Sequence, residues 1–444
     1  MITQVSVKPE VSYLYSFLEQ SRQNPPVQLD WLLELREQAK AIVYEQTLPS
    51  KRDEEWRFTD LSPLFEVEFQ AAKAPTTKLD ITPLTLPEAV DSRLVFVNGI
   101  YAPELSSVAG LPEKVFVGNL ATLPPAYASR IPQYLGKQQG SSEVFTALNT
   151  AGLTDAAVVW VPRNTIVEQP IHLLFVSTTK DVPVICQPRC LVVAETGSQL
   201  SLVEHYEANI ESCPGLELNH PYFNNQVTEI YLEENAQVNH TMYQREASNA
   251  LNICKTAISQ ARYSRYTCNA ISLGAKLSRH NLEVFQTGEG TETNLNGLTL
   301  IKSEQLADTH SVISLNHPNG NTDQLHKCIV GDRAHAVFNG QVLVPQAAQL
   351  TNAGQLNRNL LLSSKARVDT KPQLEITADN VKCTHGATVG QLDPEEVFYL
   401  QSRGIREAEA RNLLIDAFAA EIIDRIPLAS VGQRLSQCVS CRTF

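Results

Sequence analysis

From about residue 155 to residue 392 the chain consists of short runs of alternating apolar residues, separated by Gly, Asn, Asp or Glu. No window in this region sustains a helical period of 3.6 residues, and such a pattern is typical of β-strands. A small residue recurs at positions 236, 261, 275, 334, 348 and 366, where two of the intervals are 14 residues and one is 18. Two such units make one coil of about 30 residues. The repeat predicts a mainly β chain built as a parallel β-helix.

The number of coils follows from the length of this region. A coil of a β-solenoid cannot bury its inner face alone and needs a neighbour above and below. With about 30 residues per coil and about 4.8 Å between coils, residues 151–392 give roughly eight coils and a rod about 40 Å long. A β-sandwich is the competing architecture.

The N-terminal region, residues 1–150, is predicted to be helical and then irregular. Residues 11–50 carry apolar side chains at helical spacing, with Pro25-Pro26 between two helices and Asp30 as the N-cap of the second. From about residue 60 to residue 140, many prolines interrupt short strands.

The C-terminal region, residues 393–444, is predicted to be helical again. Asp393 is a suitable N-cap with Pro394 at the first helical position, and a second helix is expected from about Arg406 to Ile426. The apolar stripe of this second helix is wider than one packing face requires. It predicts either a cap on the solenoid or a partner-binding surface, and the candidate partner-binding residues are Leu413, Leu414, Ala417, Phe418 and Ile422.

Composition and motifs exclude several functions. The net charge is −12 without a concentrated basic block, so nucleic acid is not an expected partner. Apolar runs of six or seven residues are far shorter than the ~20 that span a membrane, and the N-terminus does not resemble a signal peptide. The one Gly-Lys pair, Gly136-Lys137, lacks the rest of a Gly-x-x-x-x-Gly-Lys-Ser/Thr phosphate-binding loop, so the chain is not expected to bind ATP.

The cysteines favour a reducing compartment, that is, the cytoplasm. Their number, nine, is odd and they are scattered, unlike a disulfide framework. Cys438 and Cys441 have the spacing of a metal knuckle, but they form only one pair and lie close to the C-terminus. We expect this last segment to be disordered and without function.

The pair Cys383 and His385 is the main candidate for chemistry. In a strand, residues i and i+2 share a face, so thiol and imidazole should point the same way with Cα atoms about 6.5–7 Å apart. An iron–sulfur cluster takes four protein ligands, so two are too few for a lasting site. The remaining ligands would come from elsewhere or from a second chain. The alternative is a packed cysteine beside a histidine that bonds to the backbone.

Two segments of the sequence resemble the SufB/SufD family of the Suf iron–sulfur cluster assembly machinery. The first is DNVKCTHGATVGQL at residues 379–392, followed by FYLQSRGI at residues 398–405, and the second is PSKRDEEWRFT at residues 49–59. The compact N-terminal region and the Cys-x-His setting resemble the SufD branch more than the SufB branch. The resemblance covers nearly the whole chain.

This resemblance implies a right-handed parallel β-helix flanked by helical regions, acting as a scaffold and not as an enzyme. It implies pairing with SufB through the C-terminal end of the solenoid, and docking of SufC, an ABC-type ATPase, on the C-terminal helices. It also implies that His385, with Cys383 as a secondary candidate, holds a transient iron–sulfur cluster shared with SufB. In isolation the chain is a possible homodimer. The alternatives are a SufB-type paralogue, a β-helix carbohydrate-active protein, and an interaction scaffold without cluster chemistry.

Overall fold

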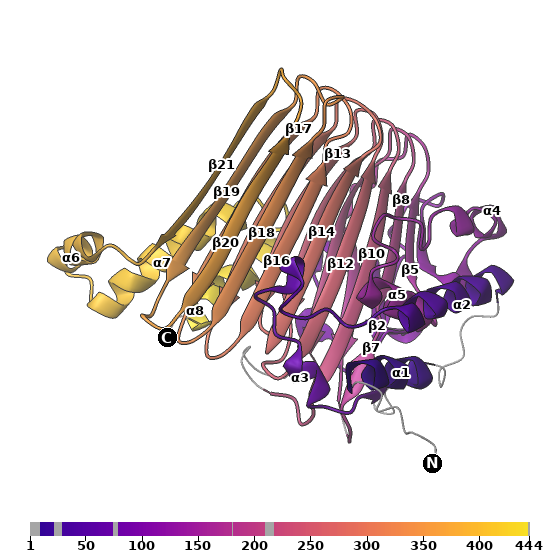
Figure 1. Ribbon diagram of the computed structural model, residues 1–444, viewed down its shortest axis with the longest axis horizontal. Coiled ribbons are helices and arrows are strands. Elements are labelled where there is room, and N and C mark those ends of the chain that lie inside the picture. The colour runs from indigo at the N-terminus through magenta and orange to yellow at the C-terminus, as the bar shows by residue number, and fades with distance from the viewer. Residues whose placement is uncertain (1–8, 22–28, 74–78, 180, 209–216, 443–444) are drawn as a thin grey trace, which may run out of the picture.

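The computed structural model describes residues 9–21, 29–73, 79–179, 181–208 and 217–442 (Figure 1). The chain is mainly β, with 40% strand and 24% helix, and its centre is a β-solenoid of about eight turns. Helical regions flank the solenoid at both ends of the chain. The predicted fold class is therefore confirmed, and the β-sandwich alternative is wrong.

Two long sheets form the walls of the solenoid, and from β8 onwards successive strands of the chain alternate between them. Sheet A contains β4 (Phe116–Asn119), β5 (Ala157–Val161), β8 (Arg189–Ala194), β10 (Tyr222–Leu232), β12 (Leu251–Gln260), β14 (Leu277–Gln286), β16 (Leu306–Ser314), β18 (His335–Val344) and β20 (Arg367–Ile376), with β1 (Gln70–Ala71) and β7 (Val184–Cys186) at its side. Sheet B contains β3 (Ile100–Tyr101), β2 (Arg93–Val97), β6 (Ile171–Ser177), β9 (Gln199–Ala208), β11 (Gln237–Arg245), β13 (Arg265–Leu273), β15 (Glu292–Ile301), β17 (Asn321–Val330), β19 (Asn352–Leu361) and β21 (Lys382–Gly390).

The strands of neighbouring coils pair in parallel with an unbroken register. From β10 onwards a coil is 26 to 32 residues long, since Leu251 pairs with Leu277 and His335 pairs with Arg367. The register stacks chemically similar side chains inside the solenoid: one ladder of sheet A reads Val192, Ile230, Ile258, Val284, Ile313, Val342. All six are buried in one hydrophobic cluster. Burying each aliphatic side chain contributes about 1.5–3 kcal/mol, so stacking of coils stabilises the fold.

The recurring small residues lie where the chain turns from one sheet to the other. Ala236, Ala334 and Ala348 are fully buried at such corners, next to the strands that they connect. Several corners hold a non-glycine residue with a left-handed backbone, for example Asn235 with a φ of 57° and Ala275 with a φ of 63°. Small side chains fit there because the corners of adjacent coils stack closely.

The N-terminal region covers the first coils and part of the outer face of sheet A. Its helices are α1 (Pro9–Ser21), α2 (Asp30–Glu45), η1 (Glu54–Trp56), α3 (Ser62–Phe65), η2 (Thr82–Leu84), η3 (Pro87–Ala89), η4 (Pro103–Leu105), η5 (Leu120–Thr122), α4 (Pro125–Ala128), η6 (Ile131–Gln133) and α5 (Val144–Ala151). The N-cap prediction for Asp30 is wrong, because Leu29 occupies that position and Asp30 is the first residue of α2. Pro25-Pro26 lies outside the described residues.

The C-terminal region packs along the outer face of sheet B through α7 and α8, whereas α6 projects away from it. It comprises α6 (Pro394–Ser402), α7 (Glu407–Ile423) and α8 (Ala429–Arg442). The side chain of Asp393 accepts a hydrogen bond from the backbone N–H of Glu395 at 2.8 Å, as an N-cap should. The predicted disorder near the C-terminus is wrong: Cys438 and Cys441 lie in α8, and Cys438 is buried against the solenoid 3.9 Å from the Tyr243 hydroxyl. None of the described helices has the length and apolarity that crossing a membrane requires.

Candidate functional site

Cys383 and His385 lie on β21, the last strand of sheet B and the last strand of the solenoid (Figure 1). In the parallel register Cys383 is opposite Ala353 and His385 is opposite Gln355. Cys383 packs against the interior hydrophobic cluster. Because side chains alternate across a strand, both positions belong to the inner face of the terminal coil. The structure thus places thiol and imidazole side by side at the open end of the interior.

This end of the solenoid is uncovered. Most residues of β21 are exposed, His385 among them, whereas Cys383 is half-buried and burial raises the pKa of its thiol. Val389, on the same strand face, is 50% exposed. An edge strand with free backbone donors and acceptors is a template for pairing with another chain.

The site is incomplete within this chain. Over the part of the sequence that the structure describes, His, Cys, Asp and Glu side chains form no group of three or more that could hold a metal ion. Neutral imidazole and thiolate are both ligands of iron–sulfur clusters. Two of them at an open end can hold a cluster only with help from another molecule.

Carboxamides line the interior immediately below this pair, and sequence reasoning missed them. Gln324, Gln355, Asn357 and Asn359 are buried on the inner faces of β17 and β19. Gln355 donates to Gln324 at 2.8 Å, and Asn357 donates to the backbone carbonyl of His326 at 3.0 Å. The sequence signal was the spacing of about 30 residues between stacked positions, which is visible only after the coil register is known.

A second polar cluster lies deeper in the interior, several coils from His385. His240 contacts the Glu204 carboxylate at 3.2 Å and the Tyr266 hydroxyl at 2.9 Å, and Thr228 donates to Glu204 at 2.9 Å. Burial works to lower the pKa of His240, yet hydrogen bonds and charges from Cys268 and Glu204 raise it to about 10. The contact between His240 and Glu204 is a buried charged contact that joins β11 to β9, and the hydrogen bond from Thr228 joins β10 to β9.

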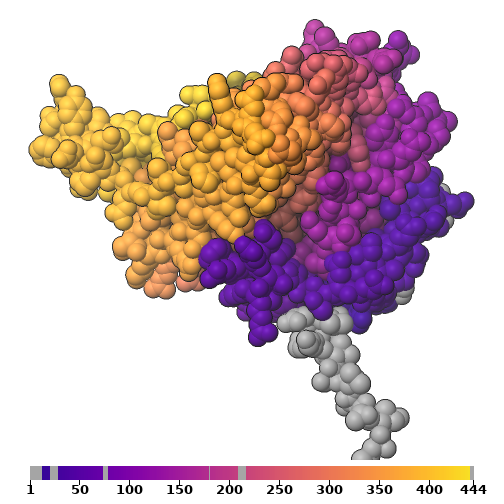
Figure 2. Space-filling model, turned by 45° about the horizontal axis from the view of Figure 1, so that its top comes forward, coloured from indigo at the N-terminus to yellow at the C-terminus, as the bar shows by residue number. Residues whose placement is uncertain are grey.

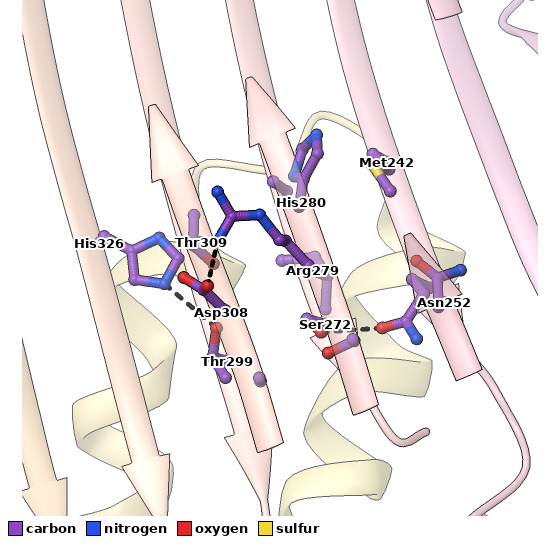
Figure 3. A pocket seen from close by; sticks show the side chains of 14 residues that line it. Met242, Asn252, Ser272, Arg279, His280, Thr299, Asp308, Thr309 and His326 are labelled. Carbon is purple, nitrogen blue, oxygen red and sulfur yellow. Dashed lines mark hydrogen bonds and ion pairs between the residues drawn. The ribbon is translucent and has the colours of Figure 1, made fainter. Parts of the chain in front are cut away.

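Between these two regions the interior contains a small cavity, with a volume of about 20 Å³ (Figure 3). His280 and His326 line it, and Thr299 shares a hydrogen bond of 3.1 Å with His326. Burial lowers the pKa of His280 to about 4 and that of His326 to about 3, so both are neutral at pH 7. The space holds about one water molecule, which makes the cavity too small for a cofactor.

Residues 49–59, the second family-like segment, cross the outer face of sheet A as a strap (Figure 1), and the same part of the chain lies against the later coils in the space-filling view (Figure 2). Glu55 contacts the Nδ1 atom of His310 at 3.1 Å, and the Nε2 atom of His310 lies 3.0 Å from Asp308. Arg279 pairs with Asp308 and lies 3.9 Å from the centre of the Trp56 ring. Glu55 and His310 line two clefts, which have volumes of about 520 and 390 Å³.

The candidate partner-binding residues of α7 have different surroundings. Leu413 is 49% exposed and Ala417 is exposed, whereas Leu414 and Phe418 are half-buried. Lys327 lies 4.4 Å from the Phe418 ring centre and donates to its backbone carbonyl at 2.9 Å. Ile422 is fully buried against sheet B, so it can support the helix but is not available to a partner.

Comparison with known proteins covers both parts of the chain. The model described as "SUF system FeS cluster assembly, SufBD core domain" matches residues 175–418, and the SufBD protein N-terminal region matches residues 7–173. An iron–sulfur cluster assembly SufBD family protein of Synechocystis sp. is 53% identical over 93% of this chain and 91% of its own length.

Two further relatives match over similar lengths. Protein ABCI7, chloroplastic, of Arabidopsis thaliana is 35% identical over 96% of this chain and 90% of its own length. The iron–sulfur cluster assembly protein SufD of Escherichia coli is 32% identical over 87% of this chain and 89% of its own length. From these matches and the solenoid that carries the Cys-x-His pair, the chain belongs to the SufBD family of iron–sulfur cluster assembly proteins.

Proposed function

We propose that this chain is the SufD-type scaffold subunit of a Suf complex, works in the cytoplasm, and is not itself an enzyme. The observation that carries the proposal is the open terminal coil, which presents His385 and Cys383 on its inner face without enough ligands for a closed site. The free state of the described cysteines fits a reducing compartment. Identity to a protein named SufD over most of both chains supports the SufD assignment over a SufB-type paralogue.

In this proposal the partner at the terminal coil is SufB, and the cluster is cargo shared across the interface. His385 is the principal ligand from this chain and Cys383 the secondary one. Imidazole is a weaker anchor for a cluster than thiolate, so a mixed site releases its cargo more readily. Weak, incomplete ligation is what a transfer scaffold needs.

The proposed division of labour follows the chain. Residues 1–150 cover the first coils, residues 151–392 form the solenoid, and residues 393–444 dock the SufC ATPase. Docking uses the exposed side of α7 at Leu413 and Ala417, with Leu414 and Phe418 at its border. The absence of a phosphate-binding loop in the sequence is consistent with ATP binding by the partner instead.

The test of the cluster site is His385→Ala in cells that depend on this complex. We expect the complex with SufB and SufC to co-purify unchanged, while cluster formation falls sharply and Cys383→Ser has a milder effect. The matched control is His317→Ala, which removes a histidine in the corner between β16 and β17. Normal cluster formation with His385→Ala would mean that the histidine is structural and that the chain is an interaction scaffold only.

A further inference from the structure

Gln355 lies directly beneath His385 in the inner ladder of sheet B, where the two residues are register partners. It is only 3% exposed. Stacked residues of neighbouring parallel strands lie about 4.8 Å apart, within reach of a hydrogen bond between long side chains. Gln355 is therefore the first buried polar group below the candidate cluster ligand.

A chain of hydrogen bonds fixes the orientation of the Gln355 carboxamide. Its Nε2 atom donates to the Oε1 atom of Gln324 at 2.8 Å, and the Nε2 atom of Gln324 donates to the Ser311 hydroxyl at 2.8 Å. Since Gln324 offers an oxygen, Gln355 must turn its nitrogen inward. Its oxygen is then left for a donor elsewhere.

The opposite sheet is shaped to hold this orientation. A Cβ atom on Gly340 of β18 would lie 2.3 Å from the Nε2 atom of Gln355, closer than any real contact. Gly340 has no unusual backbone angle that would itself require glycine. The missing side chain at position 340 thus makes room for the carboxamide.

The Oε1 atom of Gln355 is buried and has no hydrogen-bond partner among the described residues. An unsatisfied buried acceptor costs about 1–3 kcal/mol, so such an atom calls for a donor. Toward the inside, the amide nitrogen already occupies the bond to Gln324. Toward the open end, the next residue of the ladder is His385.

We propose that Gln355 is a positioning residue for His385. Its Oε1 atom accepts a hydrogen bond from one ring N–H of His385, which selects one tautomer and leaves the other ring nitrogen unprotonated and facing the partner. Histidines that bind metals usually donate their second ring N–H to such an acceptor, which sets both tautomer and ring orientation. This inference rests on the proposed role of His385 as a cluster ligand.

The test uses the full-length chain labelled with ¹⁵N-histidine, and His385→Gln assigns the His385 signals. The ring-nitrogen shifts should show one dominant tautomer in the native chain and a mixture in Gln355→Leu. In cells with the partner subunits, Gln355→Leu should lower cluster formation by about 10-fold or more, as loss of such an acceptor does at metal sites.

Gly340→Ala is a second route to the same disturbance, because it displaces the carboxamide without changing Gln355. The matched control is Gly331→Ala, where the nearest atom to an added Cβ is 3.5 Å away. We expect Gly340→Ala to give the mixed tautomer and the loss of cluster formation, and Gly331→Ala to give neither. This variant also serves if Gln355→Leu does not fold.

The outcomes separate the inference from the proposed function. A single unchanged tautomer in both Gln355→Leu and Gly340→Ala overturns the inference. Normal cluster formation in these variants, while His385→Ala is defective, also overturns it and leaves the proposed function standing. If His385→Ala itself forms clusters normally, the proposed function fails, and the tautomer result alone decides whether the hydrogen bond exists.

Discussion

At the scale of single residues, the solenoid places charged groups on both of its surfaces and pairs them. On the outer face of sheet A, Arg279 is 2% exposed, pairs with Asp308, lies against the Trp56 ring and donates to the backbone carbonyl of Glu55 at 2.8 Å. Burial works to raise the pKa of Asp308, but Arg279 and His310 outweigh it and lower the pKa to about 2. The paired carboxylate of Asp308 therefore stabilises the fold and the part of sheet A on which residues 49–59 pack.

Asp308→Asn should destabilise the chain by about 3–5 kcal/mol, because it leaves Arg279 buried without its charged partner. The pH dependence gives a second signature. A carboxyl whose pKa is lowered on folding contributes stability above its unfolded pKa of 3.8, and this stability is lost as the pH falls toward 2. The contribution is about 2 kcal/mol.

Chemical denaturation measured from pH 5 to pH 2 checks this prediction. The native chain should lose more stability across this range than Asp308→Asn does. The control is Asp323→Asn, at a side chain that is 63% exposed, which should change the unfolding free energy by less than about 0.5 kcal/mol. Parallel pH profiles for the native chain and Asp308→Asn would contradict the assignment.

At the scale of elements, α7 has one side buried against the solenoid and one side exposed. The wide apolar stripe predicted more than one buried surface, and the structure buries Ala410, Ile415, Ala419, Ile422 and Ile423. Leu413 remains on the opposite side, 49% exposed. The helix thus closes the flank of sheet B with one side and leaves the other side free for the proposed ATPase contact.

Leu413→Glu should abolish co-purification with the SufC-type ATPase while the chain stays folded. A charge on an exposed position alters the monomer little but is costly inside an apolar interface. The control is Leu33→Glu on α2, a helical leucine that is 40% exposed at the other end of the chain. Retained ATPase binding by Leu413→Glu, with loss of binding by Leu33→Glu, would move the docking site to the N-terminal region.

At the scale of the whole molecule, the two ends of the solenoid differ. At the N-terminal end, the antiparallel strands β3 and β4 finish the two sheets and the N-terminal region covers the first coils. At the C-terminal end, β21 is exposed and α6 projects beyond it, with Phe398 70% exposed (Figures 1 and 2). Association should therefore use the C-terminal end.

Val389→Lys should weaken pairing through that end, whether with SufB or with a second copy of this chain. A charge on an edge strand is a common obstacle to pairing between sheets. Sedimentation of the isolated chain and co-purification with SufB measure the two cases. The control is Ile166→Lys, which changes a residue that is 60% exposed and borders the first coils. Equal effects of the two substitutions would contradict the proposal that association uses the C-terminal end of the solenoid.

The sequence predicted the coils because their chemistry is local: alternating strands, and small residues at corners such as Ala236 and Ala348. It also placed Cys383 and His385 on one strand. It could not place Gln355 beneath His385 or Glu55 beside His310, because these contacts join residues 30 and 255 positions apart. Asp30 is not the cap because the first backbone hydrogen bonds of α2 go to the carbonyl of Leu29, which is extended and stands one residue earlier. The segment around Cys438 forms a helix because Cys438 and its neighbours pack on the solenoid, a contact that the local sequence does not show.

Because the coils stack at a constant spacing, the length of the solenoid is fixed by the number of its coils. Coils of 26 to 32 residues keep the same inner ladder, since the differences in length fall outside the paired positions. Duplication or loss of one coil in evolution would move the Cys-x-His end relative to the covered end by about 4.8 Å, and by no other amount. The distance between a partner bound at the Cys-x-His end and the N-terminal region at the other end can therefore change only in steps of one coil. A partner that contacts both ends must fit the number of coils.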